Sequence, residues 1–251
     1  FKKMNVLDLF AGIGGFSLGM ERAGHKAIGF CEIDERCQKI LAKHWPHVKL
    51  YEDVRELDYV DKVEIITAGF PCQDISIAGN QAGLGGERSG LWSEVIRITS
   101  NIRPEYLVVE NVPNLLTGPI GRAGGWFGRI LSDLAQIGFD AEWHCIPSSS
   151  VGAPCRRDRI FLIAFPQCEG GKRLVQTEDI GITGSWGWCG KEDLRFIGDN
   201  PFKRGDRWPK PIVRGMDARI PGRMDRLKAI GNSVNPHIAE IIGRSLWKYV
   251  N

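Results

Sequence analysis

The alternation of apolar β-rich runs with helical segments is the feature that most limits the fold of this chain. The runs VEIITAGF (63–70), EYLVVENV (105–112) and RIFLIAF (159–165) alternate with helical spacing at LWSEVIRITSNI (91–102) and WFGRILSDLAQIG (126–138). Apolar runs of this kind are typical of parallel strands that are covered on both faces. The pattern predicts an α/β fold with a mostly parallel sheet and helices on both faces.

The same alternation starts near the first residue and returns near the last one. MNVLDLF (4–10) and KAIGFCEID (26–34) read as strands, and GGFSLGMERAG (14–24) and CQKILAKHW (37–45) read as helices. NPHIAEIIGRSLWKYV (235–250) is a further helix candidate. Gly24 and Pro46 supply the stop signals of the first two helices.

The alternation stops after Phe165. Residues 166–212 are rich in Gly and Trp and show no sustained period, which predicts a small irregular lobe. We therefore expect an α/β domain over residues 1–165, the lobe over 166–212, and a segment over 213–251 that returns to the first domain.

Composition limits the cellular setting. With 251 residues and 43% hydrophobic content, the chain can bury one large core. Its cysteines number 7, an odd count with no C-x-x-C pair, which fits reduced thiols better than disulfides or a zinc ribbon. No apolar run approaches the roughly 18 residues of a membrane span. We expect a cytoplasmic protein without a membrane segment or a metal site.

Charge is distributed unevenly along the chain. The formal net charge is +3, but residues 1–150 hold 15 Lys and Arg against 19 Asp and Glu, whereas 151–251 hold 18 against 11. Residues 201–228 alone carry nine basic and three acidic side chains. Such a basic segment suits nucleic acid, and it equally suits a solvated face.

The stretch LDLFAGIGGF (7–16) joins a strand to a helix through a glycine turn. Gly12, Gly14 and Gly15 permit positive φ and let a ligand approach backbone donors at the start of the helix. The third glycine comes too early for G-x-G-x-x-G, which disfavours a nicotinamide dinucleotide. Glu32 and Asp53 follow the next strand segments, where carboxylates can accept hydrogen bonds from ribose hydroxyls. Each acid alone could be a surface residue, but together with the turn they indicate an adenosine-containing ligand.

GFPCQDIS (69–76) holds a cysteine immediately after a proline. Pro71 fixes its own φ and lacks an N–H donor, and polar residues follow Cys72 at once. We therefore expect the turn to expose the thiol, although a single unpaired cysteine is commonly a small buried apolar residue.

Five motifs occur in the order found in cytosine-C5 DNA methyltransferases of bacterial or phage type: DLFAGIGGF, GFPCQDIS, ENV (110–112), RRDRIFLIA (156–164) and GNSV (231–234). The chain closely resembles that family from Val6 to about Phe165 and again from about Gly215 onward. The resemblance implies a Rossmann-like S-adenosylmethionine-dependent methyltransferase fold. This fold has a seven-stranded, mostly parallel sheet and a target-recognition lobe, here reduced. Residues 1–165 would then be the catalytic and cofactor-binding domain.

The resemblance also implies the residues that bind S-adenosylmethionine and release S-adenosylhomocysteine. They lie on the glycine turn, after the next strands, at the start of a later helix and near the C-terminus: Phe10, Ala11, Gly12, Ile13, Gly14, Glu32, Ile33, Asp53, Val54, Gly69, Pro71, Leu91, Asn232, Ser233 and Val234.

The implied chemistry explains the catalytic residues. Cytosine C5 is a poor nucleophile, so a thiolate, Cys72, must add at C6 while an acid, Glu110, hydrogen-bonds or protonates N3. Arg157 and Arg159 would lie near the target base and the carboxylate. We expect these arginines to lower the pKa of Cys72 and burial to raise the pKa of Glu110. Alternatively, Glu110 is a structural carboxylate at the turn that follows it.

A cytosine inside duplex DNA must be flipped out before a thiol can reach it. Residues 76–90 hold five glycines and are predicted to form a lid, with a floppy connector as the alternative. Trp186 and Trp188 are further DNA-contact candidates, or core anchors of the lobe. The implied DNA-binding residues are Gln73, Ser76, Arg88, Arg195, Lys203, Arg204 and Arg207.

Two departures from the family pattern keep alternatives open. Cys155 stands where a glutamine usually precedes the spaced arginines, and the recognition lobe is short. An RNA cytosine-C5 methyltransferase and a non-catalytic protein that binds cofactor and DNA are the alternatives to a DNA methyltransferase. The expected partners are double-stranded DNA and a cognate restriction endonuclease, and the expected state is a monomer.

Overall fold

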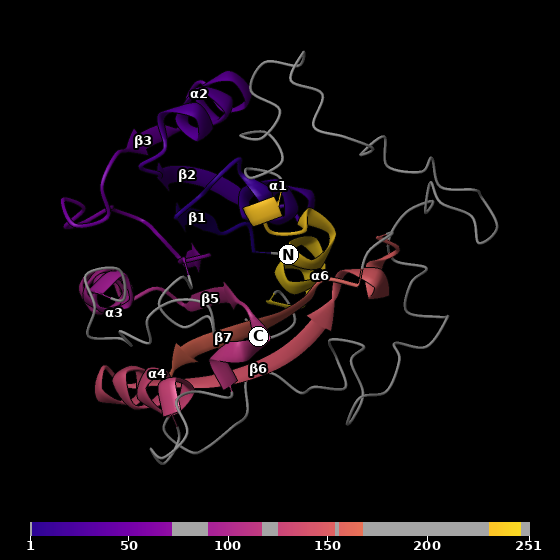
Figure 1. Ribbon diagram of the computed structural model, residues 1–251. Helices are drawn as coiled ribbons and strands as arrows, with labels where there is room; N and C mark the ends of the chain where they lie inside the picture. Colours follow the sequence, from indigo (N-terminus) through magenta and orange to yellow (C-terminus); the bar gives the residue numbers. More distant parts are fainter. Residues whose placement is uncertain (1, 72–89, 117–124, 154–155, 168–230, 247–251) are drawn as a thin grey trace.

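A single seven-stranded sheet organises the protein, in a computed structural model that describes residues 2–71, 90–116, 125–153, 156–167 and 231–246 (Figure 1). Its strand order is β3-β2-β1-β4-β5-β7-β6. The strands are β1 (Asn5–Leu9), β2 (Lys26–Cys31), β3 (Lys49–Tyr51), β4 (Ile65–Ala68), β5 (Tyr106–Asn111), β6 (Phe139–Pro147) and β7 (Asp158–Pro166).

Five α-helices and two short 3-10 helices accompany the sheet in the described residues. The α-helices are α1 (Gly15–Arg22), α2 (Glu35–His44), α3 (Gly90–Ile102), α4 (Gly125–Gln136) and α6 (Pro236–Leu246), and the 3-10 helices are η2 (Pro113–Leu116) and η3 (Ser148–Val151). Each helix predicted at 14–24, 37–45, 91–102, 126–138 and 235–250 overlaps a helix of the structure, and α2, α3 and α4 begin one or two residues earlier than predicted.

Strands β1 to β5 pair in parallel, and β7 runs antiparallel between β5 and β6. The mostly parallel sheet predicted from the sequence is confirmed. From β1 the chain proceeds outward to β2 and β3, then returns to add β4 on the other side of β1. The order reverses between β1 and β4, and at such a point the loops at the carboxyl ends of two neighbouring strands diverge.

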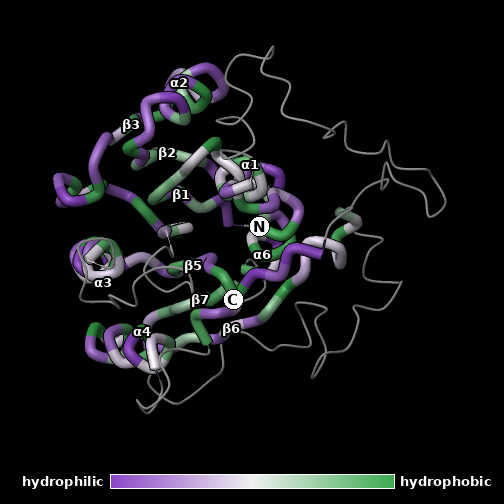
Figure 2. Tube along the Cα trace, viewed as in Figure 1, coloured by the Kyte–Doolittle hydropathy of each residue, from purple (hydrophilic) through white to green (hydrophobic). Residues whose placement is uncertain are grey.

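Apolar side chains cover both faces of the sheet. On one face Val6, Ile65 and Val108 pack in a cluster with residues of α1 and α6. On the other face the alternate residues of the same strands, including Leu7 and Ile66, pack against α3 and α4. Figure 2 shows the central strands as largely hydrophobic and the helices as mixed. The prediction of helices on both faces is therefore confirmed.

Small residues allow α1 and α6 to pack closely. A Cβ added to Gly19 of α1 would lie 2.4 Å from the Pro236 carbonyl oxygen and 2.5 Å from Ala239 Cβ. One added to Gly243 of α6 would lie 2.8 Å from Ala23 Cβ. This contact joins the segment near the C-terminus to the first helix.

Three predicted regions lie mainly outside the described residues: the loop at 76–90, the lobe at 166–212 and the segment at 213–251, of which 231–246 are described. Within the described part of the chain, no helix has the length and apolar character required to cross a membrane.

The close approach of α1 and α6 predicts the effect of a single methyl group. Gly19→Ala should lower the free energy of unfolding by about 1–3 kcal/mol, because the new Cβ meets backbone that cannot rotate away. Gly90→Ala is the matched control, since a Cβ there meets nothing within 4 Å. Urea unfolding followed by circular dichroism measures both, and equal stabilities for the two variants would contradict the close packing.

Candidate active site

The glycine turn between β1 and α1 uses its glycines for two different reasons. Gly12 and Gly14 have positive φ, at 55° and 85°, as the sequence predicted. Gly15 does not need positive φ; a Cβ there would lie 2.4 Å from the carbonyl oxygen of Val234. A Cβ on Gly12 would instead meet nothing within 4 Å. The crest of the turn is therefore open to a ligand, and its base is closed by the chain near the C-terminus.

Glu32 stands at the end of β2 and holds the glycine turn directly. Its Oε2 accepts a hydrogen bond of 2.7 Å from the Gly12 N–H, and its Oε1 accepts one of 2.8 Å from the Asp34 N–H. A carboxylate has about four lone-pair positions, so each oxygen can still accept a second bond. Glu32 can thus fix the turn and bind hydroxyl groups of a ligand at the same time.

Asp53 follows β3, in the equivalent position one strand further out. Its Oδ1 accepts a hydrogen bond of 2.9 Å from the Arg55 N–H. Val54 is buried in the apolar cluster against which Phe10 and Leu91 also pack. By contrast, Ile33 beside Glu32 leaves 71% of its surface exposed. A large exposed apolar side chain between two acids suits the flat face of a nucleobase.

The residues near the C-terminus reach the site from the opposite side. Val234 is buried, and its Cγ2 would lie 3.8 Å from a Cβ built on Gly69, which follows β4. Ser233 Oγ contacts the position of a Gly15 Cβ at 2.5 Å. Asn232 and Pro71 are exposed. The structure therefore brings the ends of β1 and β4 and residues 233–234 together.

Glu110 on β5 is a buried carboxylate beside this junction. A Cβ on Gly69 would lie 3.8 Å from its Oε2. Arg159 on β7 places its Nε 3.0 Å from Glu110 Oε1, and the two side chains are only 24% and 10% exposed. Burial raises the pKa of Glu110, and the charges of Arg159 and Arg157 oppose that rise. The direction agrees with the prediction from the sequence.

The side chain of Asn111 stabilises the turn that follows Glu110. Asn111 Oδ1 accepts a hydrogen bond of 2.7 Å from the Val112 N–H, and its Nδ2 donates one of 3.4 Å to the Phe70 carbonyl. Asn111 therefore joins the end of β5 to the end of β4. The turn is thus held by Asn111, and the role of Glu110 stays a prediction of the sequence.

Asp8 is a buried carboxylate beneath the site whose role the sequence interpretation missed. It lies inside β1, 1% exposed, and accepts hydrogen bonds of 2.7 Å from both Ser17 Oγ of α1 and Thr67 Oγ1 of β4. Burial raises the pKa of Asp8 from an ordinary value of 3.8 to about 6, against the opposing effect of these hydroxyls. The signal was available in the sequence: a charged residue within an apolar strand must find partners.

Several predicted site residues lie outside the described residues. They are Cys72, Gln73, Ser76, Arg88, Cys155, Trp186, Trp188, Arg195, Lys203, Arg204 and Arg207.

The described site residues gather at the carboxyl ends of five neighbouring parallel strands. The glycine turn follows β1, Glu32 follows β2, Asp53 follows β3, Gly69 follows β4 and Glu110 lies near the end of β5. Such an edge can hold an adenosine-like ligand over the turn and place an acid beside it. In the described part of the chain, no group of three or more His, Cys, Asp or Glu could hold a metal ion.

The model of a protein family described as C-5 cytosine-specific DNA methylase matches residues 4–179. The chain belongs to this family. A relative, the Type II methyltransferase M2.BsuMI of Bacillus subtilis, is 36% identical over 165 residues, which are 64% of this chain and 42% of the relative.

Solved structures show the same methylase fold. One is a candidate DNA modification methyltransferase encoded within a prophage (E. coli), with a TM-score of 0.58 and 25% identity over 71% of this chain and 50% of that one. Another is the S. pombe Dnmt2 methyltransferase, with a TM-score of 0.55 and 20% identity over 71% of this chain and 55% of that one.

This chain matches only part of its relatives. It covers between 38% and 49% of the length of eight curated relatives of this kind.

The burial of Asp8 predicts a pH-dependent contribution to stability. The folded pKa exceeds the unfolded one, so the contribution is complete below about pH 4 and is lost as pH rises through about 6. Relative to Asp8→Asn, the wild type should lose about 3 kcal/mol of unfolding free energy between pH 4 and pH 8. Urea titrations of both proteins measure this difference, and a difference that stays constant with pH would refute the raised pKa.

Proposed function

We propose that this chain acts as a DNA (cytosine-5-)-methyltransferase, which transfers a methyl group from S-adenosylmethionine to C5 of a flipped-out cytosine in double-stranded DNA. The observation that carries the proposal is the buried pair of Glu110 and Arg159 beside the end of β4, from which the chain leads directly to Pro71 and Cys72. Membership in the C-5 cytosine-specific methylase family supports it.

The described residues fit S-adenosylmethionine. Gly12 leaves open space over the turn, Glu32 keeps lone pairs for ribose hydroxyls, and Ile33 offers an exposed apolar surface to the adenine ring. The remaining residues proposed to contact the cofactor are Phe10, Ala11, Ile13, Gly14, Asp53, Val54, Gly69, Pro71, Leu91, Asn232, Ser233 and Val234. When bound, the cofactor supplies the electrophilic methyl group and leaves as S-adenosylhomocysteine.

In the proposed mechanism, Cys72 and Glu110 act together on the cytosine ring. The Cys72 thiolate forms a bond to C6 while Glu110 hydrogen-bonds or protonates N3, so that electron density moves to C5. After methylation, a base removes the proton from C5, the bond between sulfur and C6 breaks, and the Cys72 thiolate is restored. The raised pKa of Glu110 suits this role, because burial favours the protonated carboxyl, which can share its proton with N3.

The two arginines have complementary parts in the proposal. Arg159 orients the Glu110 carboxylate through the contact of 3.0 Å. Arg157 lies close enough for its charge to lower the pKa of Glu110, and it would stabilise negative charge on the target base or on the Cys72 sulfur.

The proposed DNA contacts are based mainly on the basic segment at residues 201–228. Residues 201–228 carry nine basic side chains, and we propose that Lys203, Arg204, Arg207 and Arg195 bind phosphates while Gln73, Ser76 and Arg88 approach the opened duplex.

The proposed domains are residues 1–165 for catalysis and cofactor binding, 166–212 for target recognition and 213–251 for the return to the first domain. The packing of α6 on α1 supports this last assignment. A cognate restriction endonuclease, a monomeric state and a cytoplasmic location stay predictions of the sequence.

The dual role of Glu32 predicts a loss of cofactor affinity. Glu32→Gln should weaken the binding of S-adenosylhomocysteine by about tenfold or more, because an amide cannot accept from the Gly12 and Asp34 N–H groups through both ends. Isothermal titration calorimetry measures the dissociation constant. Glu35→Gln, on the exposed first turn of α2, is the matched control. Equal constants for Glu32→Gln and wild type would remove Glu32 from the cofactor site.

The covalent mechanism can be tested with duplex DNA that carries 5-fluorocytosine in many sequence contexts. Fluorine at C5 cannot leave as a proton does, so the protein should stay attached to the DNA after denaturation when S-adenosylmethionine is present. Peptide mapping should locate the adduct at Cys72, and Cys72→Ser should form none. Glu110→Gln should slow adduct formation by roughly 10²-fold while binding S-adenosylhomocysteine like the wild type.

Two outcomes would redirect the proposal. Adducts that form on 5-fluorocytosine RNA and not on DNA would make the substrate RNA. Cofactor and DNA binding without any adduct would indicate a binding protein without turnover.

A further inference from the structure

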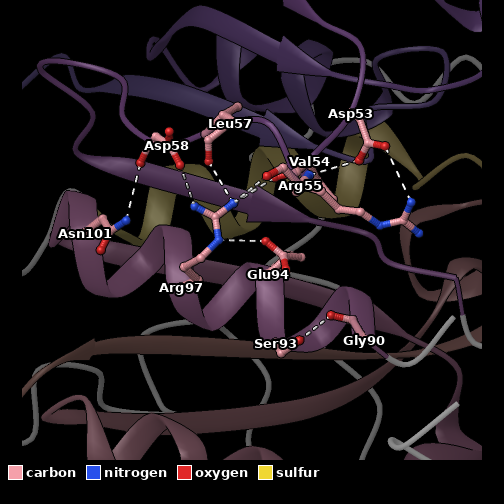
Figure 3. A network of polar contacts seen from close by, with 10 residues as sticks. All are labelled: Asp53, Val54, Arg55, Leu57, Asp58, Gly90, Ser93, Glu94, Arg97 and Asn101. Atoms are coloured by element: carbon pink, nitrogen blue, oxygen red, sulfur yellow. Dashed lines mark hydrogen bonds and ion pairs between the residues drawn. The ribbon is translucent and has the colours of Figure 1, made fainter. Parts of the chain in front are cut away.

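Arg97 lies in the middle of α3. Its guanidinium makes several polar contacts with the segment that follows β3 (Figure 3). Its Nη2 donates to the carbonyl oxygens of Val54 at 3.1 Å and Leu57 at 3.0 Å, and lies 3.4 Å from that of Arg55. One guanidinium therefore caps the carbonyl groups of a complete turn.

Two carboxylates also contact this guanidinium, Glu94 on the helix side and Asp58 directly after the turn (Figure 3). Arg97 Nε donates to Glu94 Oε2 at 2.7 Å on the same helix, and Nη1 lies 3.2 Å from Asp58 Oδ1. The Arg97 side chain is 32% exposed and that of Glu94 is 24% exposed, so solvent only partly screens their contact. Asp58 is 90% exposed and adds little. Figure 3 shows the guanidinium between the helix and the turn.

The turn has few other constraints. Its own backbone bonds are Glu56 N–H to the Asp53 carbonyl at 3.2 Å and Leu57 N–H to the Val54 carbonyl at 3.4 Å, both longer than the usual 2.9–3.0 Å. No helix or strand lies between Tyr51 and Ile65. Apart from the bond of the Arg55 N–H to Asp53 Oδ1 within the turn, the position of residues 53–57 depends on the burial of Val54 and Leu57 and on Arg97.

Arg97 also ties this turn to a second wall of the cofactor site. Leu91 belongs to the first turn of α3, and Asp53 and Val54 belong to the turn that Arg97 caps. Arg97 on α3 and Val54 in the turn are 43 positions apart in the sequence, and their hydrogen bond joins the helix to the turn directly.

We infer that Arg97 is a positioning residue for the adenosine half of the cofactor site: it fixes Asp53 and Val54 relative to Leu91 without touching the cofactor. The inference rests on the proposed function, which gives Asp53, Val54 and Leu91 their cofactor contacts. Lysine cannot replace this arginine, because an ammonium has no planar fork to reach the helix carboxylate and several carbonyls of the turn together.

The test compares Arg97→Lys with the wild type in two measurements. Hydrogen exchange of the ligand-free protein should show faster exchange of the Glu56 and Leu57 amides in the variant, since their acceptor residues lose their anchor. Calorimetry should show S-adenosylhomocysteine binding weakened by about tenfold. In a methylation assay, KM for S-adenosylmethionine should rise by a similar factor, with kcat and KM for DNA within about twofold.

Arg129→Lys is the matched control. Arg129 lies on α4, covers the same face of the sheet and forms an ion pair of 3.4 Å with Asp133, four residues later. It should change none of these quantities. If Arg97→Lys does not fold, Glu94→Gln weakens the Nε contact by removing its negative charge while keeping the turn contacts, and it should shift exchange and affinity in the same direction by a smaller amount.

The outcomes separate this inference from the proposed function. Unchanged exchange at 56–57, or unchanged affinity in the variant, overturns the role of Arg97 and leaves the proposed function standing. A drop in kcat with an unchanged cofactor KM also overturns it, because general destabilisation lowers the amount of active protein. A wild-type protein that binds no S-adenosylhomocysteine overturns the proposed function itself, whereas exchange in the ligand-free protein still reports whether Arg97 holds the turn.

Discussion

The parallel pairing of β1 with β4 is the constraint on which the rest of the site depends. The chain leaves β1 toward α1 and β2 and leaves β4 in the direction of β5, so the two loops diverge at the carboxyl ends of neighbouring strands. Asp8 bridges this pair, because its two oxygens accept from Thr67 of β4 and Ser17 of α1. The glycine turn and the residues before Cys72 are both placed by this bridge, and the space between them is where a ligand can reach both.

The sequence predicts the buried parts of this sheet well and its edges poorly. Runs such as those of β4 and β5 are apolar on both sides, so no other environment suits them. β3 has only three residues and no run to detect, and β6 has an irregular pattern in which Trp143 is 43% exposed. The antiparallel direction of β7 depends on its pairing with β5 and β6, which local composition does not encode.

The same distinction applies to the site. Motifs that are contiguous in the chain, such as the glycine turn and Glu110 to Val112, could be found because each carries its own chemistry. The bonds of Glu32 to the Gly12 N–H and of Arg97 to the Val54 carbonyl join residues 20 and 43 positions apart, so no local pattern reveals them. Gly15 is an example of what the sequence does not reveal. The sequence predicted that this glycine provides freedom in φ, whereas the fold requires a glycine there because a Cβ would collide with Val234.

Two buried carboxylates on the same face of the sheet show how environment separates structural from chemical roles. Burial raises the pKa of both Asp8 and Glu110. Asp8 is surrounded by hydroxyl donors within the protein, which use both of its oxygens and leave it sealed beneath the glycine turn. Glu110 faces guanidinium groups at the strand end, where a cation stabilises the charged form that burial disfavours. Burial favours the protonated form of Glu110 and the guanidinium groups favour the charged form, so its environment acts on proton transfer, whereas that of Asp8 serves only to hold the sheet and the turn together.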